Sequence, residues 1–321
     1  MGANYNNHLV WVTGAAGFAG SALCTTLAAH GMQVRAAVRI AHTRDEVSIG
    51  DLAAATEMQL RPLLDGVSSV VHLAARTHMP GESGGGDLEM YRRINVDATR
   101  RLATAAAEAG VKRFVFLSSI KVNGEQTFDR PYTENDAPRP EDAYGISKWE
   151  AEQALHEVAA KTGLGVVILR PPLVYGSGVK ANFLRLMRLV ARGVPLPLAG
   201  IDNRRSMVYL GNLVDAIRVC LEAPAARGRT YLVSDGPDLS TPELVRGIAD
   251  ALDVRPRLLH CPVSLLKVAG TLAGQRAQVA RLTRSLQVDS SRLHVELGWR
   301  PPHTVARGLA DTAAWYRAQF G

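Results

Sequence analysis

The stretch that decides the fold lies near the start of the chain, where residues 9–20 read LVWVTGAAGFAG. An apolar run typical of a buried strand is followed at once by a glycine-rich turn and a helix-forming sequence. Gly14 permits a tight turn, Gly17 lets the backbone approach a pyrophosphate, and Gly20 allows a helix to pack closely on the strand. The N-terminus of that helix, at Phe18, presents unpaired N–H groups to phosphates. The spacing therefore predicts a dinucleotide-binding turn that uses these four residues.

The end of the second predicted strand, at residues 33–38, indicates which dinucleotide binds. Enzymes that use NAD usually place an Asp or Glu there to bind the ribose hydroxyls, whereas an arginine accommodates the 2′-phosphate of NADP. Here the strand is followed by Arg39 and offers no acid. Arg39 would pair with the 2′-phosphate, so the sequence favours NADP. NAD stays open as the alternative, in which Arg39 is only solvated.

Short β-branched runs alternate with alanine-rich helical stretches through the first half of the chain. Strands are predicted at residues 9–13, 33–38, 47–49, 70–74, 114–117 and 166–169, and helices at residues 18–30, 88–109 and 144–161. This alternation predicts an α/β fold with a doubly wound parallel Rossmann sheet. The ligand of such a sheet lies beyond the carboxyl ends of its strands.

After Arg170 prolines become frequent and the elements shorter, which indicates a smaller mixed α/β region that binds the substrate. We therefore predict two interleaved domains. Residues 1–171 and 205–236 form the dinucleotide-binding domain, and residues 172–204 and 237–321 form the substrate-binding domain. A glycine-rich segment at residues 81–86 follows the fourth predicted strand and is the best candidate for a mobile loop beside the cofactor.

Composition narrows the expected partners. The 321 residues are 47% hydrophobic and 21% charged, enough apolar sequence to bury a large core. Cys24, Cys220 and Cys261 show neither disulfide nor metal-ligand spacing, so we expect no metal site and a reducing, cytoplasmic compartment. The net charge of +7 is spread along the chain without a nucleic-acid-binding motif. A phosphate-bearing small molecule is therefore the expected partner, and nucleic acid is not.

No stretch approaches the roughly 20 apolar residues that span a bilayer, so no integral membrane association is expected. The most apolar segment, residues 263–274, is interrupted by Lys267 and precedes Arg276, Arg281 and Arg284. Two interpretations of this segment are open. It is either an interfacial helix on a membrane or a partly buried helix with a basic solvated face. We prefer the second interpretation.

Tyr144 and Lys148 stand four residues apart, which places them on one face of a helix. A tyrosine hydroxyl has a pKa of about 10, too high for proton exchange at neutral pH. A neighbouring ammonium group and an oxidised nicotinamide would both lower this pKa. Ser119 follows the fifth predicted strand, where its hydroxyl can polarise the same substrate oxygen. Ser119, Tyr144 and Lys148 are therefore the predicted catalytic residues of a hydride-transferring enzyme.

These motifs, in this order, resemble the extended short-chain dehydrogenase/reductase family from Leu9 to Tyr316. The matches include the glycine turn, HLAA at residues 72–75, the serine, the YxxxK pair and RPPLVYG at residues 170–176. The resemblance implies that His72 is structural. The cofactor-side residues that it implies are Asp51 and Leu52 at the adenine, Ala74 and Ala75 after the fourth strand, Asn95 as a helix and water-network residue, and Tyr144 and Lys148 themselves.

Within that family the chain is similar to nucleotide-sugar enzymes, which implies a UDP-sugar substrate and a homodimer. Asn182 and Arg205 lie in segments that resemble the diphosphate contacts of those enzymes, and a guanidinium fork suits a diphosphate. Arg281 and Arg284 are weaker candidates that surface exposure would explain equally well. The substrate-binding residues implied by the resemblance are therefore Asn182 and Arg205.

The run that ends at Arg39 resembles NADP-using reductases. We therefore expect an enzyme of O-antigen or other surface-polysaccharide biosynthesis that reduces a UDP-N-acetyl-4-keto-hexose at sugar C4. The alternative is a 4-epimerase of UDP-glucose or UDP-N-acetylglucosamine. A non-catalytic NADP-binding sensor is disfavoured because all three catalytic residues are present. A 4,6-dehydratase is disfavoured because Ile120 and Lys121 stand where that reaction needs an acid/base pair.

Overall fold

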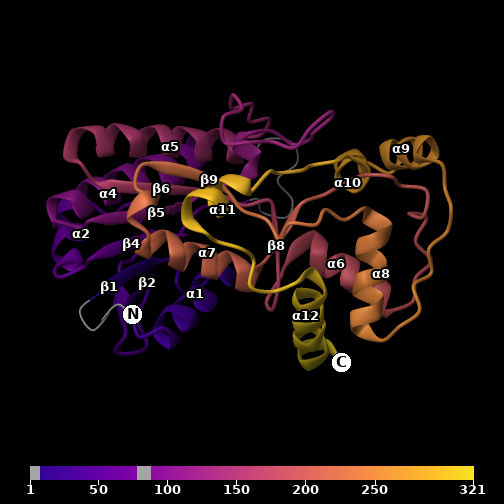
Figure 1. The fold of residues 1–321 in the computed structure, drawn as a ribbon, viewed down its shortest axis with the longest axis horizontal. Coiled ribbons are helices and arrows are strands. Elements are labelled where there is room, and N and C mark those ends of the chain that lie inside the picture. Colours follow the sequence, from indigo (N-terminus) through magenta and orange to yellow (C-terminus); the bar gives the residue numbers. More distant parts are fainter. Residues whose placement is uncertain (1–7, 78–87) are drawn as a thin grey trace.

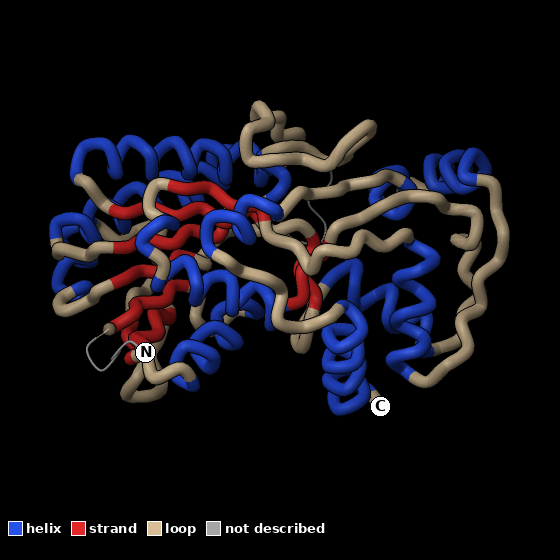
Figure 2. Tube along the Cα trace, in the orientation of Figure 1, coloured by secondary structure: helices blue, strands red, loops and turns tan. Residues whose placement is uncertain are grey.

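A computed structural model describes residues 8–77 and 88–321 of the chain. The glycine-rich loop predicted at residues 81–86 lies outside these ranges. Figure 1 shows a larger part built around a twisted sheet and a smaller, mainly helical part beside it that contains the C-terminus. In Figure 2 most of the strands gather in the larger part, with helices on both faces of the sheet.

Seven parallel strands form the central sheet in the order β3-β2-β1-β4-β5-β6-β9. They are β1 (Leu9–Thr13), β2 (Gln33–Val38), β3 (Glu46–Ser48), β4 (Ser69–His72), β5 (Arg113–Leu117), β6 (Gly165–Arg170) and β9 (Arg229–Leu232). The strand order reverses between β1 and β4, and a doubly wound sheet binds its ligand beside such a reversal. The predicted α/β fold with a parallel Rossmann sheet is confirmed.

Two layers of helices cover the sheet (Figure 1). The strand residues alternate between its faces, so Val10 and Val12 belong to one core and Trp11 to the other. The first core includes residues of α1 (Phe18–Ala29), α7 (Leu210–Glu222) and α11 (Ser291–Leu297). The second includes residues of α2 (Glu57–Leu60), α4 (Ala98–Glu108) and α5 (Ala143–Thr162). These helices cover the two faces of the sheet, and the candidate active site lies beyond the carboxyl ends of its strands.

The smaller part has its own core, built from α6 (Ala181–Ala191), α8 (Thr241–Leu252) and α12 (Val305–Phe320). A two-stranded parallel sheet, β7 (Leu173–Tyr175) with β8 (Met207–Tyr209), lies near the middle of the molecule. Helices α9 (Val263–Leu272) and α10 (Arg276–Thr283) complete this part, and α9 lies at the end remote from the central sheet (Figure 1). Short 3₁₀ turns occur at Arg61–Leu64, Ile120–Val122 and Pro224–Ala226.

The helix predicted at residues 88–109 is interrupted by a wider turn. It consists of α3 (Leu88–Tyr91), a π-helical segment at Arg92–Asp97, and α4. Asn95 lies in the π-helical segment, where its buried amide bonds to the backbone of Arg76 and to the hydroxyl of Ser147. Such turns are frequent at functional sites.

Strand β4 ends at His72, two residues before the predicted end. The cause is a side chain of the neighbouring strand. Thr13 Oγ1 accepts hydrogen bonds from the N–H groups of Leu73 and Ala74, both at 3.2 Å. These two residues therefore leave the strand ladder and cross the end of β1, which brings Ala74 against the glycine turn.

No helix within residues 8–77 and 88–321 is long and apolar enough to cross a bilayer. The apolar segment noted in the sequence forms α9, in which Gly270 is the one buried residue. Its exposed side chains include Leu265, Val268 and Leu272 as well as Lys267. The solvated face is thus apolar and basic, whereas the preferred interpretation foresaw a basic face alone.

Candidate active site

The turn after β1 has room only for glycine at two positions. Gly14 has a φ of +66°, and a Cβ there would lie 2.9 Å from the backbone nitrogen of Ala74. A Cβ on Gly20 would lie 2.1 Å from the carbonyl oxygen of Gly14. Gly17 closes the turn by donating its N–H to that same carbonyl at 2.9 Å. The tight turn and the close approach of helix to strand are therefore both present.

The first turn of α1 fits a pyrophosphate. Gly17 caps this helix without a side chain, so no side-chain oxygen covers the N–H groups that begin at Phe18. This turn, which the structure describes in full, contains no acidic residue. The dipole of the helix favours an anion at the same point. The residues present thus fit a dinucleotide, whose phosphates would be held at Gly17 and Phe18.

His72 is held as a structural residue, as the family resemblance implied. Its Nδ1 lies 2.6 Å from Thr13 Oγ1 and its Nε2 lies 2.9 Å from Thr99 Oγ1. Burial, with a smaller effect from Lys148, lowers the pKa of His72 to about 3. The imidazole is therefore neutral at physiological pH and joins β1, β4 and α4.

The residues predicted at the adenosine end lie after β2 and β3. Arg39 is exposed directly after β2, and its carbonyl oxygen accepts the N–H of Gly50 at 3.2 Å. Asp51 is also exposed, and its Oδ1 accepts the N–H of Ala53 at 3.0 Å. Leu52 is half-buried against the second core. Arg39 and Asp51 thus lie at the same edge of the sheet, and their contacts with a cofactor stay a prediction.

Ser119 and Tyr144 meet beyond the carboxyl end of β5. Ser119 begins the short turn Ile120–Val122, where its Oγ accepts the N–H of Lys121 at 3.3 Å. Tyr144 lies in the first turn of α5, and its hydroxyl is hydrogen-bonded to Ser119. The structure thereby brings together the predicted serine and tyrosine at the ligand-binding edge of the sheet.

The pKa of Tyr144 moves opposite to the direction expected from the sequence. Burial raises this pKa to about 12, and Asp142 and Tyr91 raise it too. The hydrogen bond with Ser119 lowers it, but by less than burial raises it. The sequence predicted a lowered pKa for Tyr144, and for the effect of the protein's own groups this prediction is wrong. A buried phenolate loses more hydration than the neighbouring protein groups replace.

Lys148 is 2% exposed, and its Nζ lies 4.0 Å from the centroid of the Phe116 ring. Burial lowers the pKa of Lys148 to about 7, while the carboxylate of Glu152 raises it. Lys148 therefore changes its charge near neutral pH. It is not the permanent cation that the sequence argument placed beside Tyr144.

A buried ion pair connects the segments that carry the predicted catalytic residues. Glu152 is fully buried and accepts hydrogen bonds from Arg170 Nε at 3.0 Å and Nη2 at 2.5 Å. Ser118 Oγ donates to the same carboxylate at 2.5 Å, and Arg170 Nη1 donates to Asn123 Oδ1 at 3.0 Å. The network therefore joins the strand that leads to Ser119 with the helix that carries Tyr144 and Lys148.

Asn95 supports the other side of helix α5. Its amide donates to Ser147 Oγ at 2.9 Å and to the carbonyl oxygen of Arg76 at 3.0 Å, and it accepts the N–H of Arg76 at 2.8 Å. Ser147 Oγ in turn donates to the carbonyl oxygen of Tyr144 at 2.8 Å. Asn95 is thus a positioning residue for the tyrosine, and a contact with cofactor or water stays a prediction.

Lys121 connects the loop after Ser119 to the start of α5. Its Nζ forms ion pairs with Glu125 Oε1 at 2.7 Å and with the carboxylate of Asp142. Asp142 also caps α5 by accepting the N–H of Gly145 at 2.7 Å. The position at which a dehydratase needs an acid is therefore held by a paired cation, in agreement with the argument against that reaction.

A pocket of about 630 Å³ opens beside Ser119 and is lined by both predicted substrate-binding residues, Asn182 and Arg205. Asn182 lies in the first turn of α6, and Arg205 lies just before β8. Other charged side chains in the wall are Lys121, Glu125, Arg276, Arg281 and Arg284. The fold thus gathers the predicted catalytic serine and several arginines from distant segments around one cavity.

Arg205 also holds part of the pocket wall. Its Nη1 donates to the carbonyl oxygens of Arg281 at 2.8 Å and Arg284 at 3.1 Å. Burial lowers the pKa of Arg205, and Glu125 raises it. Arg205 therefore fixes the end of α10, so that Arg281 and Arg284 line the same pocket.

Sequence reasoning missed residues that position the site, namely Glu152, Asn123 and Ser147. One signal was available for Glu152, since Tyr144, Lys148 and Glu152 recur every four residues on one helix face. No local pattern marks the other two, because their partners come from distant segments. Among the described residues, no group of three His, Cys, Asp or Glu is placed to hold a metal ion.

The parallel sheet, the glycine turn and the serine–tyrosine–lysine set define a dinucleotide-dependent enzyme of the Rossmann class. Comparison with known proteins then gives the family. The NAD dependent epimerase/dehydratase family matches residues 10–234, and this chain belongs to it. The resemblance to extended short-chain dehydrogenases/reductases is confirmed.

Relatives match over nearly the whole chain. A UDP-glucose 4-epimerase of Vibrio cholerae is 44% identical over 310 residues, covering 95% of this chain and 94% of the relative. An N-acetyl-alpha-D-glucosaminyl-diphospho-ditrans,octacis-undecaprenol 4-epimerase of Escherichia coli O157:H7 is 30% identical, covering 95% and 94% of the two chains. A solved structure of MoeE5 in complex with UDP-glucose and NAD superposes with a TM-score of 0.78 at 30% identity, covering 97% of this chain and 99% of that chain.

Proposed function

We propose that this chain is a UDP-sugar 4-epimerase that uses NAD and acts on UDP-glucose or UDP-N-acetylglucosamine. The observation that carries the proposal is the pocket in which Ser119 shares a cavity with Arg205, Arg281 and Arg284. Guanidinium groups suit a diphosphate, and the serine then lies where a sugar attached to that diphosphate can reach it. The name of the Vibrio cholerae relative and the UDP-glucose in the MoeE5 structure support the choice of substrate.

The protein's own part in the reaction is proton exchange at the sugar O4. Tyr144 Oη exchanges the proton, and Ser119 Oγ hydrogen-bonds both Tyr144 and O4. Because burial holds the pKa of Tyr144 near 12, positive charge beside the phenol is needed to form the phenolate that accepts the O4 proton on oxidation and returns it on reduction. The protonated form of Lys148 contributes such charge below its pKa of about 7.

The residues of the glycine turn, with Phe18, would hold the dinucleotide at the end of β1 and beside Tyr144. When bound, NAD would accept a hydride from sugar C4, return it to the opposite face, and add positive charge near the phenol in its oxidised state. The chain's remaining task is to exclude water and to keep the sugar within reach of Ser119 and Tyr144 during both transfers.

NAD replaces NADP in this proposal. The preference for NADP rested on Arg39, and the comparisons do not support it, since the matched family is NAD dependent and the MoeE5 structure contains NAD. An epimerase regenerates its cofactor in every cycle and gains nothing from exchange with NADPH. The 4-keto reductase interpretation rested on the same arginine, and its epimerase alternative is the better supported of the two.

The test is interconversion without a reductant. The purified protein is incubated with catalytic NAD⁺ and either UDP-glucose or UDP-N-acetylglucosamine, and anomeric proton NMR follows the sugar. We expect the C4 epimer to accumulate to equilibrium, and we expect Tyr144→Phe to slow this at least about 100-fold while Tyr316→Phe on α12 does not. Stoichiometric consumption of NADPH by a 4-keto UDP-sugar, with no epimer formed, would instead assign the reductase activity.

Four further statements stay predictions. They are the interleaved division at residues 1–171 and 205–236 against 172–204 and 237–321, the homodimer, the cytoplasmic location, and the role in surface-polysaccharide biosynthesis. Sedimentation velocity would test the dimer directly. Limited proteolysis at Arg204 and Gly236, which are exposed at two of the proposed boundaries, would test the domain division, because exposed inter-domain segments are cut first.

A further inference from the structure

Helix α9 exposes an unusual amount of apolar surface for an element of a globular protein. Leu265 and Val268 are each 58% exposed, Leu272 is 84% exposed, and Leu259 just before the helix is 55% exposed. Exposed apolar residues that occur singly are ordinary, but a cluster on one short segment marks an interaction site. We call Leu265, Val268 and Leu272, together with Lys267 and Arg276 on the same two helices, the α9–α10 surface.

The same segment is strongly cationic. Between Asp253 and Asp289 the chain contains no Asp or Glu. The cations in this interval are Arg255, Arg257, Lys267, Arg276, Arg281 and Arg284. Within the part of the chain that the structure describes, none of their side chains forms an ion pair with a carboxylate. Their charge is therefore available to an anionic partner.

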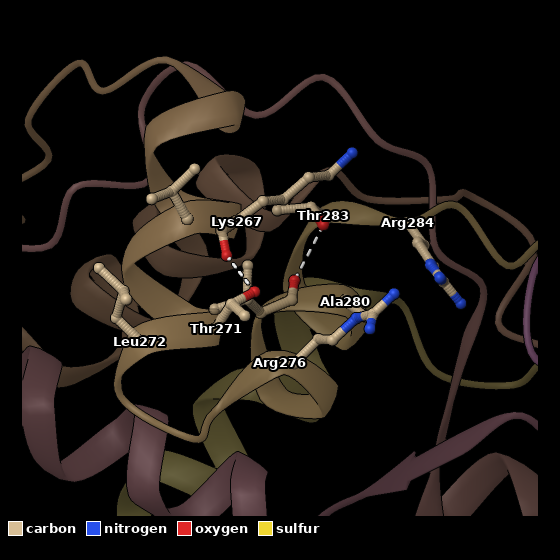
Figure 3. Close-up of a pocket in the computed structure, with 9 residues that line it drawn as sticks. Lys267, Thr271, Leu272, Arg276, Ala280, Thr283 and Arg284 are labelled. Atoms are coloured by element: carbon tan, nitrogen blue, oxygen red, sulfur yellow. Dashed lines mark hydrogen bonds between the residues drawn. The ribbon is translucent and has the colours of Figure 1, made fainter.

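The apolar and cationic groups meet in a pocket of about 470 Å³ between α9 and α10. Figure 3 shows Leu272 on one side of this pocket and the charged ends of Lys267, Arg276 and Arg284 on the other. Helix α10 has no buried residue and packs mainly against α9. Helix α9 thus lies at the end of the molecule remote from the central sheet, and α10 lies between α9 and the pocket that contains Ser119 (Figure 1).

We propose that the α9–α10 surface docks on an anionic phospholipid bilayer. The exposed leucines and Val268 would enter the boundary between headgroups and acyl chains, and Lys267 and Arg276 would pair with lipid phosphates. The association is peripheral, in keeping with the absence of a bilayer-spanning helix in residues 8–77 and 88–321. The proposal does not depend on which sugar the active site takes.

Charge is the reason to prefer a membrane over a second copy of the chain. A two-fold symmetric contact through this surface would place the same cations of both copies against each other. A nucleic acid would satisfy the cations but would leave Leu265 and Leu272 in contact with water. An anionic bilayer is the partner that satisfies the apolar and the cationic groups together.

The position of the surface links it to the candidate active site. Arg276, Ala280 and Arg284 line both the pocket between α9 and α10 and the pocket that contains Ser119. A bilayer bound at α9 would therefore adjoin the mouth of the catalytic pocket. Catalysis would then take place at the membrane surface.

The test uses the full-length protein and sedimented vesicles. Vesicles of phosphatidylcholine with one quarter phosphatidylglycerol should bind at least about tenfold more protein than pure phosphatidylcholine, and added salt should reverse this. Leu265→Ser with Leu272→Ser, and separately Lys267→Glu, should each reduce binding about fivefold or more. The matched control is Met58→Ser on α2, which is 83% exposed and lies elsewhere.

Activity measured in solution distinguishes a failure of the membrane proposal from a failure of the proposed function. None of the substituted residues lines the pocket that contains Ser119. We expect unchanged epimerase rates with water-soluble UDP-sugar and unchanged melting temperatures. Equal binding to both vesicle types, or binding that the leucine and lysine variants leave intact, would overturn the membrane assignment. Concentration-dependent dimerisation lost in the leucine variant, without vesicle binding, would assign the surface to a second copy.

Discussion

Lys148 Nζ lies 4.0 Å from the centroid of the Phe116 ring, inside the protein and one helical turn beyond Tyr144. An aromatic face attracts a cation, but it replaces only part of the hydration that burial removes. The pKa of Lys148 therefore falls to about 7, even though Glu152 acts to raise it. The charge of the site consequently depends on pH in the neutral range.

This lowered pKa predicts a pH-dependent stability. An unfolded lysine titrates near 10.5 and the folded Lys148 near 7, so the unfolded chain binds more protons between these values. The contribution of Lys148 to the free energy of unfolding must therefore rise with pH in that window and be lowest below pH 7. Compared with Lys148→Met, the wild type should gain on the order of 2–3 kcal/mol from pH 7 to pH 9 in urea unfolding. A constant difference between the two proteins would contradict the lowered pKa.

The proton-exchange role of Tyr144 predicts a large loss of turnover without a loss of fold. Tyr144→Phe should lower kcat at least about 100-fold, because the group that exchanges a proton with O4 is gone. Ser119→Ala should also lower kcat and should shift the pH profile upward, since the serine hydrogen bond lowers the pKa of Tyr144. Steady-state rates between pH 6 and 10 provide the measurement. A wild-type rate in folded Tyr144→Phe protein would exclude the assignment.

Arg39 should govern discrimination between the two dinucleotides. It is exposed directly after β2, where no acid precedes it. Arg39→Ala should weaken NADP⁺ binding by about 1.5–3 kcal/mol, the scale of a hydrogen bond to a charged group, and leave NAD⁺ binding nearly unchanged. Isothermal titration calorimetry with both dinucleotides measures this. An equal loss for both would show that Arg39 contacts something other than the 2′-phosphate.

Removing one partner of the buried pair of Arg170 and Glu152 should lower the free energy of unfolding strongly. Replacing both partners by apolar residues should lower it much less. Arg170→Met leaves a buried carboxylate without its guanidinium and should cost about 3–5 kcal/mol of unfolding free energy. Arg170→Met combined with Glu152→Leu should recover much of that loss, since no uncompensated charge is left. Chemical unfolding of both variants provides the measurement.

The matched control for this pair lies on the surface. Arg204→Met breaks an ion pair in which the Arg204 side chain is 50% exposed and the Glu243 side chain is 44% exposed. This substitution should lower the free energy of unfolding by at most about 1 kcal/mol. If Arg170→Met were as mild as this control, the buried network would not be a main support of the site. If the double variant were as unstable as the single one, the loss would come from packing rather than from an unpaired charge.

Local features of the sequence were enough to predict much of the fold and part of the site. The glycine turn, the alternation of strands and helices, and the spacing of Tyr144 and Lys148 each depend on residues within about one turn or one strand of each other. Backbone geometry and helical periodicity determine such arrangements without help from the rest of the chain. The same locality explains the small errors, since the early end of β4 depends on Thr13 in a neighbouring strand.

Tertiary structure decided which distant residues share the candidate site and how burial shifts their pKa values. Ser119, Asn182 and Arg205 line one pocket only because the chain returns to the same edge of the sheet. The supporting role of Glu152 depends on its buried hydrogen bonds with Arg170, which is distant in the sequence. The direction of the pKa of Tyr144 was beyond sequence reasoning, because hydration lost on burial depends on every segment that packs around a group and not on its neighbours in the chain.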